Sequence, residues 1–204
     1  MEIELKYIIP DEQTAQAIWD NQLFKDEEET NSRDEMSLHA KYFDTENYDL
    51  EREQIAYRVR REGDKHIASL KWKGHSEDGL HVREEINVPV DSQEPNLEVF
   101  RESRVGSEAL DFLKDKELKC LLETKVRRRN FRIDTGKGIY EISIDYGEIV
   151  TEGGNTPISE VEIELFSGEE DELKEIGRKL QDSYNLIPEN DSKYARGMKL
   201  INEN

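Results

Sequence analysis

The sequence predicts an α+β fold, namely a closed eight-stranded antiparallel β-barrel with helices packed outside it. Eight segments alternate apolar and polar side chains with a period of two, as strands with one buried face do. Most of them follow one another through short turns, which favours antiparallel pairing over a doubly wound parallel sheet. Charged side chains share one parity of nearly every segment, which suits the lining of a barrel. We expect one domain over residues 1–204.

Each expected strand is a run of alternating residues bounded by turn formers such as Glu62-Gly63-Asp64 or by the Gly74–Gly79 stretch. In the opening strand, for example, Glu2, Glu4 and Lys6 alternate with apolar side chains. In chain order the strands are expected at residues 2–9, 38–44, 55–61, 65–73, 80–89, 118–133, 138–147 and 158–166.

The expected helices show apolar residues at helical spacing between these strands and after the last one. The second of them is expected to break near Val105-Gly106, and Asp191 or Ser192 is placed to cap the last one. The helices are expected at residues 11–23, 96–113, 169–184 and 192–200.

Composition excludes several classes of function. The 204 residues carry 29 Lys and Arg against 48 Asp and Glu, a net charge of −19, which argues against binding nucleic acid or an anionic membrane. No apolar stretch is long enough for a transmembrane helix, and the N-terminus lacks the order of a signal peptide. Cys120 is the only cysteine, so no intramolecular disulfide or multi-cysteine metal site can form. We expect a cytoplasmic protein, either a monomer or a homodimer.

The charged parity of the strands is nearly balanced and sorted by sign. Glutamates concentrate in the first and last strands and bases in the middle ones, whereas the solvated face of an ordinary sheet, the simpler alternative, mixes Thr, Ser and Gln among its charges. The ten bases are Lys6, Lys41, Arg58, Arg60, Lys71, Lys73, Arg83, Lys125, Arg127 and Arg129, and the nine acids are Glu2, Glu4, Glu85, Glu123, Glu141, Asp145, Glu160, Glu162 and Glu164.

Pointed into a barrel, these side chains would line a lumen with one basic and one acidic wall. An eight-stranded barrel has room for one small ligand. The basic wall suits a polyanion, and the acidic wall would repel that anion unless a divalent cation stood between them. Carboxylate oxygens are the ligands that Mg²⁺ and Mn²⁺ prefer. The pattern therefore indicates a metal-bridged phosphate chain.

Short motifs in the same order resemble one known family. Glu2-Ile3-Glu4-Leu5-Lys6 is similar to the N-terminal Glu-x-Glu-x-Lys signature of the CYTH superfamily, the triphosphate tunnel metalloenzymes. The resemblance covers nearly the whole chain and is greatest to the bacterial inorganic-triphosphatase branch. It continues through Tyr42-Phe43-Asp44-Thr45, Tyr57-Arg58-Val59-Arg60, Leu70-Lys71, Gly79-Leu80-His81 with Arg83 and Glu85, Glu141 to Asp145, Glu160 to Leu165, and Ser192 to Gly197.

The resemblance implies a tunnel that binds a small-molecule triphosphate with Mg²⁺ or Mn²⁺. It implies catalytic roles for Glu4 and Glu162 as metal-holding acids and for Lys125 beside the hydrolytic water, although Lys125-Val126-Arg127-Arg128-Arg129 leaves the register open by one pair. Glu160 is expected behind the metal ligands. The implied metal ligands are Glu2, Glu4, Glu162 and Glu164, with Asp145 as a further candidate, and the implied phosphate-binding residues are Lys6, Arg58, Arg60, Lys71, Arg127, Lys193 and Arg196, joined by Lys41, Lys73, Arg83 and Arg129 on parity.

Three functions are compatible with these residues. The first is hydrolysis of a triphosphate, either inorganic or organic such as thiamine triphosphate. The second is adenylate cyclisation, as in class IV-type adenylate cyclases, and the third is polyphosphate binding without hydrolysis. Trp72 has the parity of the apolar face and Trp19 lies in a helix, so neither is expected to stack on an organic group in the lumen. That favours inorganic triphosphate, cleaved to pyrophosphate and phosphate.

Overall fold

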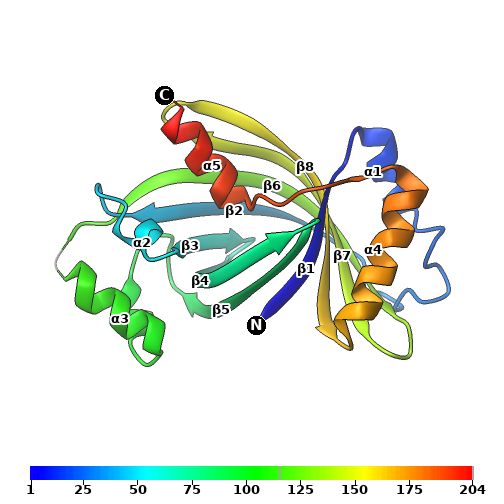
Figure 1. Ribbon diagram of the computed structural model, residues 1–204, viewed down its shortest axis with the longest axis horizontal. Helices are drawn as coiled ribbons and strands as arrows, with labels where there is room; N and C mark the ends of the chain where they lie inside the picture. Colours follow the sequence, from blue (N-terminus) through cyan, green and yellow to red (C-terminus); the bar gives the residue numbers. More distant parts are fainter. Residues whose placement is uncertain (115, 204) are drawn as a thin grey trace.

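The computed structural model describes residues 1–114 and 116–203, and its strands form a closed barrel (Figure 1). Eight antiparallel strands are hydrogen-bonded in the order β5-β4-β3-β2-β6-β7-β8-β1, and pairing of β1 with β5 closes the ring. The predicted fold class is confirmed. The strands are β1 (Glu2–Ile8), β2 (Asp34–Asp44), β3 (Ile55–Glu62), β4 (Lys65–Glu77), β5 (Leu80–Val90), β6 (Lys119–Asp134), β7 (Ile139–Thr151) and β8 (Gly154–Ser167), with a two-residue β9 (Ile187–Pro188) beside β1.

Several helices begin at residues whose side chains cap the first turn. The carboxylate of Asp11 accepts a hydrogen bond from the Thr14 amide at 2.7 Å, and the hydroxyl of Ser192 accepts one from the Ala195 amide at 3.1 Å. The expected break in the second helix lies earlier than Val105, because Ser103 caps a new helix there. The helices are α1 (Glu12–Trp19), α2 (Asp49–Arg52), a 3₁₀ turn η1 (Leu97–Phe100), α3 (Arg104–Leu113), α4 (Glu170–Tyr184) and α5 (Lys193–Asn202).

Two apolar cores lie between the barrel's outer surface and the helices. One joins α1 and α4 to the outward side chains of β1, β7 and β8, and the far end of β6 adds Phe131 and Ile133. The other joins α2, η1 and α3 to the outward side chains of β3 and β4, including Tyr57 and Leu70. Burying the apolar parity outside forces the charged parity of these strands inward.

A third core lies inside the barrel, under the C-terminal helix. α5 lies across one end of the barrel, and Met198 packs there against Leu122 and Ile149 (Figure 1). Gly197 permits this approach, since a Cβ at that position would stand 2.5 Å from the Leu122 side chain. The inner face of β2 and β6 is consequently apolar at this end. Among the described residues, no helix is both long and apolar enough to cross a bilayer.

Candidate active site

Charged side chains converge in the barrel lumen on a cavity of about 230 Å³. The lining is balanced, with seven acidic and seven basic side chains, so the lumen is neutral although the chain carries a net charge of −19. We call this cavity the tunnel. Its acidic lining residues are Glu2, Glu4, Glu85, Glu141, Asp145, Glu162 and Glu164, and its basic ones are Lys6, Arg58, Arg60, Lys71, Arg83, Arg128 and Lys193.

The acidic wall of the tunnel is formed by β1, β7 and β8, where register places carboxylates opposite one another. Glu164 is the cross-strand partner of both Glu4 and Glu141. Side chains at such positions are close neighbours on one sheet face, and like charges there repel. Burial and, to a lesser degree, nearby carboxylates raise the pKa of Glu164 to about 7. These carboxylates belong to Glu2, Glu4, Glu162 and Glu141. Within the described residues no basic side chain is in ion-pair contact with Glu164.

The N-terminal glutamates contact three bases and share one of them, Arg83. Glu2 accepts from the Lys71 ammonium at 2.8 Å and from Nε of Arg83 at 3.0 Å. Glu4 receives Arg83 at 3.0 Å and Lys6 at 3.3 Å, both on Oε1. These bases come from β4, β5 and β1, so the Glu-x-Glu-x-Lys motif is held from three strands.

Glu162 and Asp145 are each in contact with two or more bases. Oε1 of Glu162 contacts Lys6 at 3.0 Å and Lys193 at 2.9 Å, and its Oε2 accepts from Arg128 at 2.5 Å. The Asp145 side chain, 1 % exposed, accepts from Arg128 at 2.7 Å and from Lys193 at 2.8 Å. Burial opposes ionisation of both carboxyls, but these cations outweigh it and hold both pKa values below the ordinary range.

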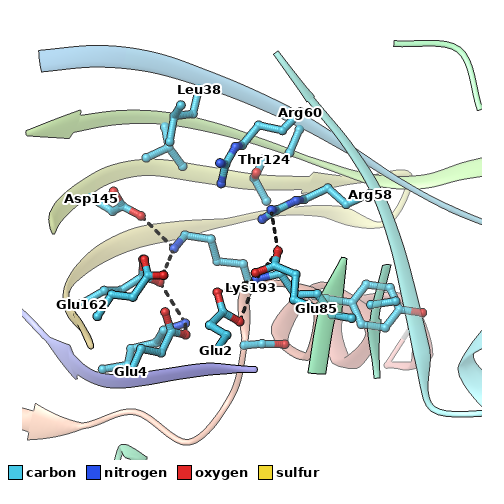
Figure 2. A pocket seen from close by; sticks show the side chains of 18 of the residues that line it. Glu2, Glu4, Leu38, Arg58, Arg60, Glu85, Thr124, Asp145, Glu162 and Lys193 are labelled. Atoms are coloured by element: carbon cyan, nitrogen blue, oxygen red, sulfur yellow. Dashed lines mark hydrogen bonds and ion pairs between the residues drawn. The ribbon is translucent and has the colours of Figure 1, made fainter. Parts of the chain in front are cut away.

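Arg58 and Arg60 form the basic wall across the tunnel from Glu2, Glu4 and Glu162 (Figure 2). Arg58 contacts Ser69 at 3.2 Å and Glu85 at 3.6 Å, and its Nε is buried without an acceptor. Burial lowers the pKa of Arg60, and the neighbouring Arg58 and Arg128 lower it further. The buried Nε–H of Arg58, which has no acceptor, and the crowded guanidinium groups beside it favour binding of an anion.

The structure corrects the predicted placement on β2 and β6. Leu38, Ala40 and Tyr42 of β2 and Thr124, Val126 and Arg128 of β6 line the tunnel, so the opposite parity points outward. The Arg127 side chain is 68 % exposed, against 15 % for Arg128. A water-activating role for Lys125 is incompatible with this placement. The predicted lumen residues that lie outside are Lys41, Lys125, Arg127 and Arg129, along with the acid Glu123 of the same stripe.

The inversion has a physical cause. Helix α5 covers the inner face of β2 and β6, which makes that face apolar, while Lys125 and Arg127 meet water outside. The alternation is therefore intact, but its polar side faces solvent. Arg129, also outside, donates to Gln16 of α1 at 3.0 Å.

Lys73 is a second correction, and a β-bulge is its cause. The β4–β5 register shifts between Trp72 and His75, and Lys73 has a left-handed backbone with φ of 52°. Beyond this point the parity counted from Lys71 no longer applies. Lys73 is exposed and lines a surface groove outside the barrel.

The remaining predicted residues are brought together. Lys6, Arg58, Arg60, Lys71, Arg83 and Lys193 line the tunnel with Glu2, Glu4, Asp145, Glu162 and Glu164. Arg196 lies beside it and donates to Glu160 at 2.5 Å. Glu160 is fully buried and bonded to Lys193 and Arg196, behind the lining acids.

Arg128, Tyr42 and Tyr194 are among the lining residues that sequence reasoning missed. Tyr42 and Tyr194 stack with ring centroids 5.5 Å apart at the α5 end of the tunnel. Arg128 carried a signal, since it is the even-numbered member of a triple arginine run, in phase with the apolar side chains of Leu122 and Val126. Trp72 packs on the outer core as expected, and it also lines a pocket that adjoins the tunnel.

The donor set of the acidic wall fits a divalent cation. It consists of carboxylate oxygens, the preferred ligands of Mg²⁺ and Mn²⁺, and Glu164 lacks a cation to balance it. Asp145, Glu160 and Glu162 form a second group of carboxylates, with one oxygen of each within 4.8 Å of the others. That cluster already contacts Lys6, Arg128, Lys193 and Arg196, so we place the cation deficit at Glu164.

Most of this chain is similar in sequence to a known protein. The chain is 27 % identical over 160 residues to an inorganic triphosphatase of Haemophilus influenzae, covering 78 % of this chain but only 44 % of that protein. The chain thus spans less than half the length of this relative.

Solved structures share the fold at low identity. A candidate adenylyl cyclase from Hippeastrum, described as having a dominant triphosphatase activity, superposes with a TM-score of 0.73 at 21 % identity, covering 98 % of this chain and 96 % of that one. A Pyrococcus horikoshii protein superposes with a TM-score of 0.55 at 21 % identity over 98 % of this chain and 99 % of that one. Residues 1–198 match the CYTH domain. This protein therefore belongs to the CYTH domain family.

Proposed function

We propose that the chain hydrolyses inorganic triphosphate to pyrophosphate and phosphate with the help of a divalent cation. The observation that carries this proposal is the neutral tunnel with its two walls of opposite sign. A triphosphate carries several negative charges. The basic wall attracts them, and the acidic wall repels them. A divalent cation held beside Glu164 would supply the positive charge that reconciles the anion with the acidic wall.

The basic wall would bind and orient the phosphate chain. Arg58 and Arg60 are two residues apart on β3, about 6.6 Å along the strand, and Arg128 faces the same space from β6. Guanidinium groups bind phosphate oxygens through paired hydrogen bonds. Phosphoryl transfer to water depends on such positioning and charge neutralisation more than on covalent help. The proposed mechanism therefore does not depend on the outward Lys125.

The acidic wall would hold the divalent cation. Glu2, Glu4 and Glu164 offer carboxylates there, and in the described part of the chain no basic side chain is in ion-pair contact with Glu164. When bound, the metal supplies charge neutralisation at phosphate oxygens. Glu162, also predicted as a ligand, has both oxygens in ion pairs before substrate enters.

Ligand entry would exchange ion-pair partners rather than fill an empty basic pocket. Lys71 and Arg83 neutralise Glu2 and Glu4 in the ligand-free tunnel. Buried charges are costly when a partner is removed alone. We expect the metal to take over the glutamates before substrate arrives, so that Lys71 and Arg83 can turn to phosphate when triphosphate enters.

Phosphate release tests the proposal. Purified protein is assayed with inorganic triphosphate in Mg²⁺ or Mn²⁺ and after exhaustive chelation. Turnover with either metal and its loss on chelation are expected, and full turnover without metal contradicts the metal's role. Arg58→Ala should raise KM by about 10- to 100-fold, from lost charge-assisted hydrogen bonds. Arg61→Ala, on the same strand but exposed, is the matched control and should behave as wild type.

An aromatic-bearing triphosphate is the second candidate substrate. A pocket lined by Trp72, Ile55 and Tyr194 adjoins the tunnel and shares Lys71 and Arg83 with it. A ring placed there would leave its phosphates at the tunnel bases. ATP and thiamine triphosphate therefore belong in the same assay, with cyclic AMP measured separately. Preference for either organic substrate overturns the inorganic assignment, and binding without turnover favours a polyphosphate-binding role.

A further inference from the structure

The three most closely grouped carboxylates of the barrel already surround a cation of the chain itself. Asp145 of β7 and Glu160 and Glu162 of β8 place one oxygen each within 4.8 Å of one another, which is a spacing suited to metal ligands. The ammonium of Lys193 contacts all three, at 2.8 Å from Asp145 and 2.9 Å from Glu162, and with a direct contact to Glu160. Figure 2 shows the Lys193 side chain reaching across the tunnel toward Asp145 and Glu162.

The position of Lys193 is fixed by its helix. It is the first residue of α5, and Ser192 caps that helix, so the side chain leaves the helix at the tunnel end. Only 13 % of the Lys193 side chain is exposed, and Asp145 and Glu160 are almost fully buried. An ammonium with three hydrogens can satisfy three carboxylates at once.

The charge around this cluster leaves no room for a divalent ion while Lys193 is in place. Arg128 contacts Asp145 and Glu162, and Arg196 contacts Glu160. With Lys193, three bases face three acids, and Lys6, which Glu162 shares with Glu4, adds a further contact at 3.0 Å. A divalent ion added to this balanced group would be repelled by the bases. The wall around Glu2, Glu4 and Glu164 differs, because Glu164 has no basic partner among the described residues.

We propose that the Lys193 ammonium is the built-in cation of the Asp145–Glu160–Glu162 cluster, standing where a second metal ion would otherwise bind. This inference rests on the proposed function, which places a divalent cation at Glu2, Glu4 and Glu164. Before substrate arrives the protein accordingly binds one divalent ion. Lys193 acts as a positioning residue for the acidic wall in that state, and the phosphate-binding role implied by resemblance is not its ligand-free role.

The first test counts Mn²⁺ ions on the substrate-free protein, by electron paramagnetic resonance of the free ion. Wild type should bind one Mn²⁺. Asp145→Asn and Glu160→Gln should each keep that ion with its affinity unchanged within about twofold, whereas Glu164→Gln should weaken it at least tenfold. Two Mn²⁺ ions on wild type, or loss of the ion in Asp145→Asn, would overturn the inference while leaving a metal-dependent enzyme. No Mn²⁺ on any variant would count against the proposed function as well.

The second test removes the built-in cation. Lys193→Ala vacates the space between the three carboxylates and removes the one cation that contacts all of them, so a second Mn²⁺ should bind. Adding Asp145→Asn to Lys193→Ala should abolish that second site. Lys199→Ala is the matched control, since Lys199 lies on the same helix, is 62 % exposed and pairs with Asp191. A folded Lys193→Ala protein that still binds one Mn²⁺ would overturn the inference, and if that variant does not fold, the single amide variants above decide it.

Discussion

Two glutamates on the same face of one barrel strand differ in pKa because different side chains lie beside them. Glu162 and Glu164 are two positions apart on β8 and both line the tunnel. Three bases contact Glu162, and its pKa lies well below the ordinary value in spite of burial. Glu164 is buried near four other carboxylates, and both effects raise its pKa to about 7. Sequence predicted that both face the lumen, but their opposite electrostatics depend on Arg128 and Lys193, which arrive from β6 and α5.

The two glutamates should therefore respond oppositely to neutralisation without metal. The raised pKa of Glu164 means that its ionisation destabilises the folded state as pH rises from about 4.5 to 7. Glu164→Gln should thus gain up to about 3 kcal/mol over wild type at pH 8 and little at pH 4.5. Glu162→Gln should lose stability at pH 8, since it strips a partner from buried bases. Urea unfolding with chelator at both pH values measures this, and equal gains for Glu164→Gln at both would contradict it.

Tyr42 is the lumen residue that the misplaced parity of β2 concealed. Burial favours the neutral phenol, but Arg58, Lys193 and Lys71 outweigh it and lower the pKa of Tyr42. Its hydroxyl therefore lies among the bases that would bind phosphate. Tyr42→Phe keeps the ring stacked on Tyr194 but removes the hydroxyl, and should raise KM for triphosphate about 3- to 10-fold. Tyr194→Phe, which removes the hydroxyl of the other ring, is the control for the ring pair. An unchanged KM in Tyr42→Phe would show that the Tyr42 hydroxyl takes no part in binding triphosphate.

At the scale of elements, the sequence predicted all eight barrel strands, and it predicted which parity faces inward where helices cover the outside. The apolar parity of β1, β3, β4, β7 and β8 is buried under α1 to α4, so charge points inward. β2 and β6 broke the rule because α5 enters the barrel and covers their inner face. Periodicity shows that a strand has two unlike faces, but not which one a distant helix will cover. The bulge after Trp72 was hidden for a related reason, since register depends on the partner strand.

The corrected register of β6 makes a prediction about neighbouring residues. Arg128→Ala should reduce kcat/KM for triphosphate by at least 10-fold, because it removes a tunnel guanidinium and leaves Asp145 and Glu162 short of a partner. Arg127→Ala should change kcat/KM by less than about twofold, since its exposed pair with Glu35 contributes little. Steady-state kinetics of both variants, with melting temperatures to confirm folding, decide between the two registers. The reverse ranking would restore the register expected from sequence.

At the scale of the whole molecule, charge is divided between a neutral tunnel and an acidic exterior. The seven acids and seven bases of the lining cancel, so the net charge of −19 lies elsewhere on the chain. The sequence already implied this division, because its alternating stripes were nearly balanced. It could not show that several outward bases, Lys125 and Arg127 among them, belong to the exterior. A polyanion must therefore cross a repulsive field before it meets the tunnel.

This division predicts an unusual salt dependence. Long-range repulsion between the exterior and a triphosphate is screened as the Debye length falls from about 30 Å at 0.01 M to about 8 Å at 0.15 M ionic strength. The partly buried pairs of the tunnel are screened much less. With metal held in excess, kcat/KM for triphosphate should therefore rise severalfold as KCl is raised over this range, and kcat should change little. Replacing four exposed acids outside the tunnel with their amides, at Glu53, Glu84, Glu94 and Glu102, should raise kcat/KM at low salt and flatten the dependence. A steady fall of kcat/KM with salt in wild type would mean that local attraction at the tunnel mouth outweighs the field of the whole molecule.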